Sequence, residues 1–471
     1  MAHRAAARRS AGNEPPPFDF LIVGGGQAGI PLAQHLAKTG HRVALAERRN
    51  LGGSCVNFGC TPTKAAIASA RAAFQARRGA VFGLRIPTVE VDFPAVLDRA
   101  RSIVMQSRAS LRRDFEKSDN PLLLRGHARF TGRKEDLFRL SVGEATVLAR
   151  QVVLDTGTRT RLPDVEGLDD VDYLEAGNWL DRRKLPERVL FIGGGYIALE
   201  MGQFYRRMGS QVTIVDPAGS ALDHEDPDVV HLLQRLLEAE GLQFRLGSRV
   251  TRVAAGRGGV TLHVETDGHR DRIRGSHVFV AAGRQPNTDD LGLEAVGVKV
   301  RRDGTVETDE RLATSAPGIW AAGDIRGGPM FTHTAWDDFR VLKSQLTGDG
   351  TRTTRRVTPY AVYTDPELGR VGATEGEARA GGAQVRIGRF EMRDNGKARE
   401  LSETNGSVKV VVDAATDLIL GAAVLSTDGS ELVHLLVALM NAKAPYTVLR
   451  DSIHIHPTLA EGVQSAVASL E

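Results

Sequence analysis

Residues 18–29 read FDFLIVGGGQAG, an apolar run that leads directly into a glycine-rich turn. Residues 188–198, RVLFIGGGYIA, repeat this arrangement. A predicted helix follows each turn, and a second apolar run then ends on an acidic residue, Glu47 in the first copy and Asp216 in the second. Strand, glycine turn, helix and strand in this order form the unit of a parallel sheet covered by helices. The sequence therefore predicts an α/β fold that contains this unit twice.

The spacing inside each copy predicts a dinucleotide site. Both copies place 23 positions between the first glycine and the acid, close to the ~20 residues of a dinucleotide fingerprint. Glycines let backbone N–H groups approach a pyrophosphate at the helix start, and the acid accepts hydrogen bonds from ribose hydroxyls. Two plain glycine turns are the alternative, which duplication at matched spacing disfavours. The candidate contacts are Gly24, Gly26, Gly29 and Glu47 in the first copy, and Gly193, Gly195, Ala198 and Asp216 in the second.

The only two cysteines of the 471-residue chain, Cys55 and Cys60, follow the first copy. A chain of this length builds a large core, and a crosslink across five residues would stabilise it little, so the pair indicates chemistry. On a regular helix two such residues lie about 8–9 Å apart, whereas a disulfide needs about 4.4–6.8 Å. A reversible disulfide therefore predicts a helix that is distorted or only beginning, which Gly52, Gly53 and Gly59 permit. On spacing alone, two unrelated buried thiols stay an alternative.

The cysteines stand in GGSCVNFGCTPTK, residues 52–64, which resembles the active-site signature of the flavin-dependent pyridine nucleotide–disulfide oxidoreductases. That family includes dihydrolipoyl dehydrogenase, glutathione reductase and mercuric reductase. The resemblance implies a redox-active Cys55–Cys60 pair, FAD at the first nucleotide site and a nicotinamide cofactor at the second. It further implies that Cys60 faces the flavin and that Cys55 exchanges with the substrate. The implied fold has two Rossmann-like domains, for FAD and for NAD, and an α+β C-terminal dimerisation domain in a homodimer.

Four further segments resemble the same family. They are LDTG at 154–157, where the family usually has alanine in place of Asp155, AAGRQPN at 281–287, AAGD at 321–324 and GPMFTH at 328–333. In the family the aspartate of the third segment binds the ribityl chain of FAD, although a plain turn is the better interpretation of that segment alone. The remaining cofactor-binding residues implied by the resemblance are Gly53, Ser54, Lys64, Ala128, Thr156, Gly157, Glu200, Val250, Gly283, Asp324, Met330, Phe331, Thr332 and His333.

Two pairs of ionisable residues complete the predicted site. Residues 454–461 read HIHPTLAE, and the family uses the histidine before the proline with the glutamate five positions on, here His456 and Glu461. In the family this pair moves a proton for the cysteines of the partner chain, and the His–Pro bond is cis; histidine titrates in a suitable range. The competing His454 is interpreted as an interface or core histidine. The resemblance also pairs Lys64 with Glu200 beside the flavin, where positive charge lowers a thiol pKa; a surface lysine and an ordinary helical glutamate are the alternative.

The second acid predicts which nicotinamide cofactor is used. Asp216 is suited to hydrogen-bond a ribose 2′-hydroxyl and repels a 2′-phosphate. No lysine or arginine occurs in the eleven residues after it. NAD(H) is therefore expected in preference to NADPH.

Composition limits the class of protein. Hydrophobic residues make up 41% of the chain and charged residues 25%, as in soluble globular proteins. The 61 basic and 58 acidic residues nearly balance, which gives no electrostatic case for nucleic acid. No apolar run approaches the ~20 residues of a membrane span. A cycling thiol pair is expected in a reducing, cytoplasmic compartment.

The predicted organisation has four parts. Residues 1–16 are expected to be a disordered tail, since they are rich in arginine and alanine without a hydrophobic stretch; a short transit peptide is the alternative. Residues 17–160 and 285–350 form the expected FAD domain, and 161–284 the NAD(P) domain. Residues 351–471 form the expected dimerisation domain, with a strand at 407–412 and an amphipathic helix near 431–440.

The substrate is the least determined feature. Asp216, the single Lys64 and the HIHPT ending favour a dihydrolipoyl dehydrogenase-like reaction on a small disulfide or dithiol. Val56, Phe58 and Thr61 depart from that motif and resemble mercuric reductase-like sequences, for which Hg(II) is the alternative substrate. However, the C-terminal cysteine pair of true mercuric reductases is absent from this sequence. A flavin-binding NADH oxidase or regulatory flavoprotein stays open as a different class.

Overall fold

The computed structural model describes residues 16–470, so the predicted tail lies outside the described residues except for its last position. The chain divides into two compact units. Unit 1 comprises the described residues up to Gly53, with Arg108–Thr158 and Pro286–Thr354. Unit 2 comprises Ser54–Ser107, Arg159–Gln285 and the described residues from Arg355 onward. Both cysteines belong to unit 2 in this division.

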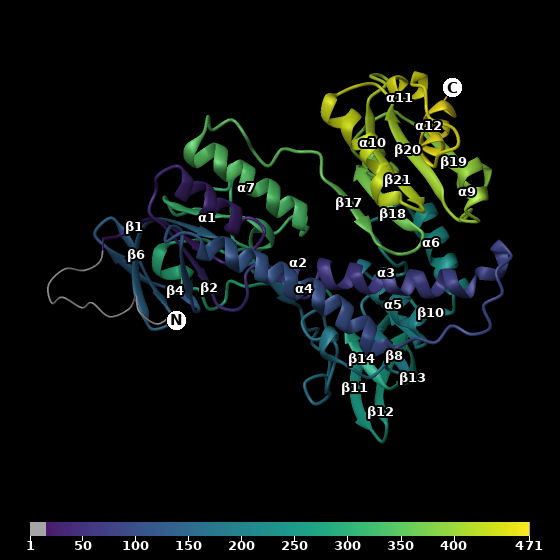
Figure 1. Cartoon of the computed structure of the whole chain (residues 1–471), viewed down its shortest axis with the longest axis horizontal. Helices are drawn as coiled ribbons and strands as arrows, with labels where there is room; N and C mark the ends of the chain where they lie inside the picture. Colours follow the sequence, from purple (N-terminus) through teal and green to yellow (C-terminus); the bar gives the residue numbers. More distant parts are fainter. Residues whose placement is uncertain (1–15, 471) are drawn as a thin grey trace. The chain divides into compact units, whose positions relative to one another are not determined.

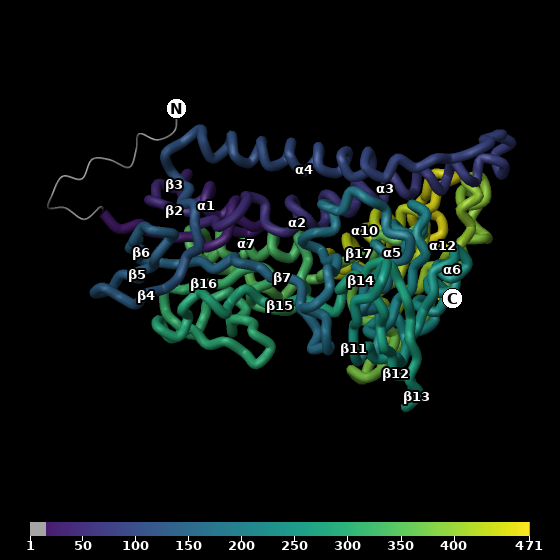
Figure 2. The backbone as a smooth tube through the Cα atoms, turned by 90° about the horizontal axis from the view of Figure 1, so that it is seen from below, coloured from purple at the N-terminus to yellow at the C-terminus, as the bar shows by residue number. Residues whose placement is uncertain are grey.

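A seven-stranded sheet forms the centre of unit 1, in the order β3-β2-β1-β6-β5-β4 with β16 also pairing with β6. Strands β3, β2, β1, β6 and β16 run parallel, whereas β4, β5 and β6 form an antiparallel meander. Figure 2 shows β4, β5 and β6 next to one another in the backbone trace. The strands are β1 (Phe18–Val23), β2 (Val43–Glu47), β3 (Leu122–Arg125), β4 (Ala128–Lys134), β5 (Leu137–Val142), β6 (Ala145–Leu154) and β16 (Ile319–Ala321).

Both faces of β1 are buried, which explains why this strand is apolar without alternation. Leu21 and Val23 pack into the core on one face of the sheet, and Phe20 and Ile22 pack into the core on the other. Helices α1 (Gly29–Lys38) and α7 (Thr332–Thr347) lie side by side over the second face (Figure 1). Unit 1 also contains the 3₁₀ turns η3 (Leu293–Val296) and η4 (Gly323–Arg326).

Unit 2 contains three larger sheets. A parallel sheet has the order β10-β9-β8-β14, an antiparallel sheet the order β11-β12-β13, and a five-stranded antiparallel sheet the order β17-β18-β21-β20-β19. Their strands are β8 (Arg188–Ile192), β9 (Gln211–Val215), β10 (Leu242–Arg245), β11 (Ser248–Gly256), β12 (Gly259–Thr266), β13 (His269–Gly275), β14 (His277–Val280), β17 (Pro359–Val362), β18 (Glu367–Gly372), β19 (Val385–Glu391), β20 (Ser407–Asp413) and β21 (Ile419–Ser426).

The helices of unit 2 pack on these sheets and on one another. Helix α5 (Tyr196–Met208) is buried over nearly its whole length because it packs against α3 (Cys60–Arg77) as well as against β8 and β9. The other helices and turns are η1 (Gly79–Phe82), η2 (Trp179–Asp181), α6 (Pro227–Ala239), α8 (Glu375–Ala380), η5 (Met392–Asp394), α9 (Gly396–Glu400), α10 (Gly429–Ala442), α11 (Thr447–Asp451) and α12 (Ala460–Ala468). The boundary between the units falls within or next to α2 (Gly53–Asn57), α4 (Phe93–Glu116), β7 (Thr158–Thr160) and β15 (Arg284–Pro286).

The predicted repeat is present. The first copy folds as β1–α1–β2 in unit 1 and the second as β8–α5–β9 in unit 2. In both copies the two strands are parallel neighbours. The strand expected at 407–412 is β20, and the helix expected near 431–440 lies within α10.

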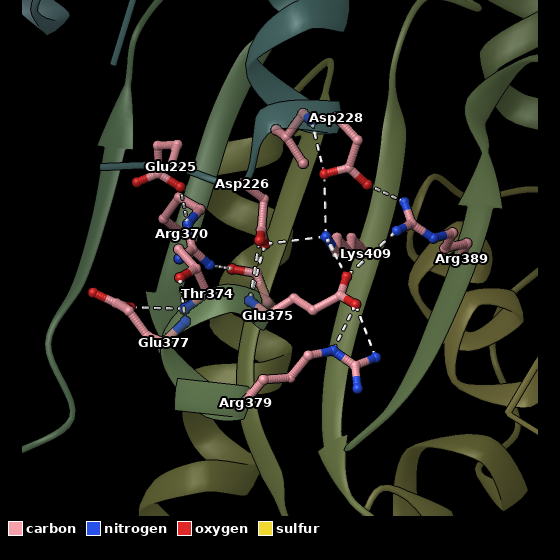
Figure 3. A network of polar contacts seen from close by, with 12 residues as sticks. Glu225, Asp226, Asp228, Arg370, Thr374, Glu375, Glu377, Arg379, Arg389 and Lys409 are labelled. Atoms are coloured by element: carbon pink, nitrogen blue, oxygen red, sulfur yellow. Dashed lines mark hydrogen bonds and ion pairs between the residues drawn. The ribbon is translucent and has the colours of Figure 1, made fainter. Parts of the chain in front are cut away.

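A buried ionic network inside unit 2 ties α6 to the five-stranded sheet (Figure 3). The ammonium of Lys409, on β20, lies 3.3 Å from Asp226, 3.1 Å from Asp228 and 2.9 Å from Glu375. Asp226 precedes α6 and Asp228 lies in its first turn, while Glu375 begins α8. The lysine side chain is only 4% exposed, so its three carboxylate partners compensate the cost of burying its charge.

Among residues 16–470, the structure contains no helix that is both long and apolar enough to cross a membrane.

Candidate active site and nucleotide sites

The first glycine turn joins β1 to α1 in a geometry that only glycine tolerates. Gly24 has a φ of +111°, and a Cβ there would lie 2.2 Å from the backbone oxygen of Asp155. The backbone N–H of Gly25 donates to Glu47 at 2.8 Å, and the other carboxylate oxygen of Glu47 accepts from the N–H of Arg49 at 2.6 Å. The acid at the end of β2 therefore holds the glycine turn in place.

The second turn has the same geometry and the same pattern of hydrogen bonds. Gly193 also has a φ of +111°, and a Cβ there would lie 2.4 Å from the backbone oxygen of Ala281. The N–H of Gly194 donates to Asp216 at 2.5 Å, and the N–H of Ala218 donates to the other oxygen of Asp216 at 2.7 Å. The two acids thus hold their glycine turns in the same way in both copies.

Space at the second turn fits a bound pyrophosphate. A Cβ on Gly195 would meet no atom within 4 Å, although this residue caps the N-terminus of α5. Internal packing therefore does not explain the glycine, whereas close approach of a phosphate to the helix N-terminus does. Gly157 in unit 1 has a φ of +64° and equally open surroundings. The residues present fit two dinucleotide cofactors.

Asp155 is an acid at a position where the second copy of the repeat has alanine. Its backbone oxygen lies next to Gly24, just as that of Ala281 lies next to Gly193. Its carboxyl group accepts a hydrogen bond from the N–H of Gly29 at 2.7 Å, in the first turn of α1. Burial raises the pKa of Asp155 well above its ordinary value, and the nearby Asp324 and Asp338 raise it further against the opposing backbone hydrogen bonds.

The turn at Gly323–Asp324 is held by residues that sequence reasoning missed. Asp338, fully buried on α7, accepts from the N–H of Gly323 at 2.8 Å and from the Arg326 guanidinium at 2.8 and 3.0 Å. Thr158 donates to Asp324 at 3.0 Å. No local sequence pattern links Arg326 and Asp338, which are twelve positions apart, to this turn.

The other predicted cofactor residues are distributed over several elements. In unit 1, the rings of Phe331 and His333 stack with centroids 5.4 Å apart at the start of α7, and Thr156 donates to the backbone oxygen of Asn287 at 2.9 Å. Met330 and Thr332 are the neighbours of Phe331 in sequence, and Ala128 is buried at the start of β4. Gly53 and Ser54 begin α2, where the two units meet in sequence; in unit 2, Val250 lies on β11 and Gly283 between β14 and β15.

The cysteines flank a break between two helices, as their spacing predicts. Helix α2 ends at Asn57, and α3 begins at Cys60. The N–H groups of Phe58 and Gly59 both donate to the backbone oxygen of Ser54, at 3.1 and 2.7 Å, which winds the chain into a wider turn than an α-helix. The Cys55 side chain is partly buried, and that of Cys60 is exposed.

Lys64 and Glu200 form the expected ion pair at 2.6 Å within unit 2. The second oxygen of Glu200 accepts from the backbone N–H of Tyr363 at 2.9 Å, and the ring centroid of Tyr363 lies 4.6 Å from the Lys64 ammonium. Burial opposes the charge on Lys64, but the attraction of Glu200 and its hydrogen bond outweigh burial, so the pKa of Lys64 is raised. The site therefore holds a permanent positive charge at neutral pH.

His456 and Glu461 also pair as expected. The Nδ1 atom of His456 lies 2.9 Å from one Glu461 oxygen, and the N–H of Thr458 donates to the other at 2.8 Å. The His456–Pro457 bond is cis. The Thr458 N–H and then His456 hold the pKa of Glu461 below its ordinary value, so this carboxylate stays charged. With Nδ1 engaged and the side chain 77% exposed, Nε2 of His456 is the nitrogen available for proton transfer.

Comparison with known proteins places this geometry in a family. Residues 18–338 match the family described as pyridine nucleotide-disulphide oxidoreductase, and residues 358–467 match the dimerisation domain of the same family. These matches cover most of the chain and support a homodimer.

Relatives of this chain cover it almost completely. A dihydrolipoyl dehydrogenase from Cupriavidus necator is 33% identical over 466 residues, which are 96% of this chain and 98% of the relative. The probable pyridine nucleotide-disulfide oxidoreductase RclA of Escherichia coli is 32% identical over 95% of this chain and 98% of its own length. The solved structure of the Cu(II) complex of the HOCl-induced flavoprotein disulfide reductase RclA, from the same organism, superposes with a TM-score of 0.87 at 30% identity and covers 96% of this chain and 99% of that chain.

These comparisons do not favour the mercuric reductase-like alternative. The dihydrolipoyl dehydrogenase and RclA each match at least 95% of this chain at 32–33% identity. The chain belongs to the pyridine nucleotide-disulphide oxidoreductases and is an FAD-dependent oxidoreductase that acts on a sulfur group with NAD(P)H as partner cofactor.

Proposed function

We propose that the chain transfers electrons between NADH and a small disulfide or dithiol through FAD and the Cys55–Cys60 pair. The observation that carries this proposal is the helix break that presents both cysteines immediately before the Lys64–Glu200 ion pair. A positive charge one helical turn after Cys60 favours the thiolate, which is the reactive form of cysteine. The overall reaction consumes one disulfide, NADH and a proton and yields two thiols and NAD⁺.

Each sulfur has a separate task in this proposal. The Cys55 thiolate attacks a sulfur of the substrate, forms a mixed disulfide and releases the first substrate thiol. Cys60 then attacks the Cys55 sulfur, which re-forms the Cys55–Cys60 disulfide and releases the second thiol. His456 gives the proton to the departing thiolate, and the hydrogen bond to Glu461 fixes the tautomer of His456. Bound FAD supplies the two-electron chemistry that links nicotinamide to sulfur.

The repeat supports two nucleotide sites, and the family resemblance supports FAD at the first and the nicotinamide cofactor at the second. The proposed FAD domain consists of residues 17–160 and 285–350, with the first glycine turn and Glu47 at the adenosine end and Asp324 at the ribityl chain. The proposed NAD domain consists of residues 161–284, with Asp216 on the adenosine ribose. Both oxygens of Asp216 already accept backbone N–H groups, which orients the carboxylate and supports a preference for NADH over NADPH. Residues 351–471 are the proposed dimerisation domain.

The relatives and the motif support a substrate class. Dihydrolipoyl dehydrogenases among the relatives, together with Asp216 and His456, support a lipoyl-type dithiol or disulfide. RclA has been solved as a Cu(II) complex, so a soft or redox-active metal ion is a second acceptor to test. Paired thiolates such as Cys55 and Cys60 suit such an ion. A cycling dithiol also supports a reducing compartment such as the cytoplasm.

The proposal is tested with the purified enzyme and a panel of acceptors. Lipoamide, glutathione disulfide, Cu(II) and Hg(II) are each assayed with NADH and with NADPH. Turnover of lipoamide or another small disulfide with NADH is the expected result. Consumption of NADH that depends on oxygen alone would contradict the proposal and favour a flavin oxidase.

The cysteine assignment has its own test. The Cys55→Ser variant should lose disulfide turnover by at least about 10³-fold, because the exchange nucleophile is gone. Reduction of its flavin by NADH, followed in a stopped-flow spectrophotometer, should stay within about twofold of the native rate, since the hydride step does not use this sulfur. Unimpaired disulfide turnover would show that Cys55 is not the exchange thiol.

A further inference from the structure

One face of α5 forms hydrogen bonds with the chain segment that carries Tyr363. Glu200, Gln203 and Arg207 follow one another at helical spacing on that face. Glu200 accepts from the N–H of Tyr363 at 2.9 Å, and Gln203 exchanges two hydrogen bonds with the backbone of Asp365, at 2.8 and 2.9 Å. The Arg207 guanidinium donates to the Asp365 carboxylate at 2.6 Å. Because Glu200, Gln203, Arg207 and Asp365 are all buried, these bonds place Tyr363 firmly.

The ring of Tyr363 faces the ammonium of Lys64. The Nζ atom lies 4.6 Å from the ring centroid, inside the range of a cation–π contact. The same ammonium bonds Glu200 at 2.6 Å. Glu200 therefore joins both residues, with one oxygen on Lys64 and the other on the Tyr363 backbone. Lys64 is enclosed by a carboxylate on one side and an aromatic face on another.

Lys64 in turn lies next to a redox cysteine. Cys60 and Lys64 are four residues apart on α3, so they occupy the same helix face one turn apart. A cation at that distance favours the thiolate. Glu367 is a further charged group close to Tyr363. Arg71 lies 4.0 Å from the carboxylate of Asp365, two residues after Tyr363. Burial raises the pKa of the Tyr363 phenol, so the ring is neutral at physiological pH and acts through its face.

We propose that Tyr363 is a positioning residue that holds the Lys64 ammonium beside Cys60 and so keeps this thiol in its reactive form. The contact restricts a side chain that otherwise has four rotatable bonds and strong affinity for water. The inference deepens the proposed function, since it explains how Cys60 is activated. It does not depend on which disulfide the enzyme reduces.

The two-cysteine composition of the chain allows a direct experiment. In the Cys55→Ser background Cys60 is the only thiol, so its alkylation by iodoacetamide can be followed from pH 5 to 10 in the full-length holoenzyme. Tyr363→Leu removes the aromatic face and leaves the backbone bond to Glu200 intact. We expect the midpoint of its pH profile to rise by about 0.5–1 pH unit, which makes alkylation near pH 6 about three to ten times slower.

Tyr363→Phe is the matched control, because it keeps the face and loses only the hydroxyl. Its pH profile should coincide with that of the parent. In a Lys64→Met background the Tyr363→Leu change should add no further shift, since the charge that the ring positions is absent. Circular dichroism and FAD content verify folding, and Tyr363→Met replaces the leucine variant if the latter does not fold.

Two results would overturn the proposal. One is an unchanged alkylation profile in Tyr363→Leu with intact FAD content. The other is the same shift in the Lys64→Met background, which would mean that the ring acts through general packing. Failure of the proposed function is recognised separately, because the native enzyme would then lack disulfide turnover while the Cys60 profile could still be measured.

Discussion

The carboxyl group of Asp155 accepts a hydrogen bond from the backbone N–H of Gly29 at 2.7 Å, across 126 positions of sequence. An acid thus lies at the N-terminus of α1, directly behind the glycine turn of the first nucleotide site. The second copy of the repeat has Ala281 at this place, with the same close approach to its first glycine. The second copy forms its glycine turn without a carboxyl group at this position. We therefore expect the first glycine turn to form when the carboxyl group of Asp155 is removed.

Removing this carboxyl group should loosen the flavin site. Asp155→Ala leaves the buried N–H of Gly29 without its acceptor, at a cost of about 1–3 kcal/mol. Asp155→Asn retains an acceptor oxygen and should lose less. The measurement is the temperature at which FAD fluorescence appears as the cofactor is released. Equal midpoints for the native and alanine proteins would show that the bond contributes nothing.

The same residue predicts a pH dependence with a definite sign. Since burial raises the folded-state pKa of Asp155, the folded protein binds more protons than the unfolded chain between the ordinary carboxyl pKa and the raised one. Stability contributed by this group is present at low pH and is lost as pH rises through that window. The FAD-release midpoint of the native enzyme should fall more steeply with increasing pH than that of Asp155→Asn. Parallel curves would mean that Asp155 is charged in the folded protein.

Asp216 should determine the nicotinamide preference. We expect the native enzyme to favour NADH over NADPH by at least about tenfold in kcat/KM, since a carboxylate hydrogen bond is worth about 1.5–3 kcal/mol. Asp216→Asn should weaken that preference mainly through a poorer kcat/KM for NADH. Glu47→Gln, the corresponding change in the first copy, is the control and should affect FAD retention without altering the NADH-to-NADPH ratio. A native preference for NADPH would refute the assignment.

The Lys409 network should be required for the stability of unit 2 (Figure 3). Lys409→Met leaves the buried Asp226 without its cation and should lower the free energy of unfolding by about 3–5 kcal/mol in urea. Lys117→Met is a suitable control, because Lys117 pairs with Asp114 on the surface, where such pairs contribute about 0–1 kcal/mol. Similar losses of unfolding free energy in both variants would contradict the expectation that the buried pairs of Lys409 contribute more than a surface pair.

His456 should act in proton transfer and not in flavin reduction. His456→Ala is expected to lower disulfide turnover by about 10²–10⁴-fold, while NADH reduces the flavin at the native rate. Glu461→Gln should give a smaller loss, because it keeps the bond to Nδ1 and removes only the charge.

Mixed dimers test whether the histidine serves the partner chain. Co-expression of the Cys55→Ser and His456→Ala chains should restore turnover, because one of the two sites in a mixed dimer then combines an intact cysteine pair with an intact histidine. Absence of any recovery in purified mixed dimers would place both groups in the same chain.

Much of the site was predictable because its signals are local. The glycine turns, their acids and the cysteine motif each lie within a short stretch, where strand and helix periodicity and the φ requirements of glycine restrict the possible structures. The pairing of His456 with Glu461 is also local, at five residues. By contrast, the support of the Gly323–Asp324 turn by Asp338 and Arg326 was not predicted, since helical spacing does not tell which buried acid turns toward a given backbone N–H.

The sequence by itself determined the family chemistry: two nucleotide-binding repeats, one dithiol and a C-terminal histidine–glutamate pair. Only the tertiary structure decided that Asp155 caps α1 and that Tyr363 joins Glu200, 163 positions away, to enclose Lys64. The physical reason is that a buried charge or N–H group needs a hydrogen-bonding partner within about 3 Å. Which groups lie that close is decided by the packing of the folded chain.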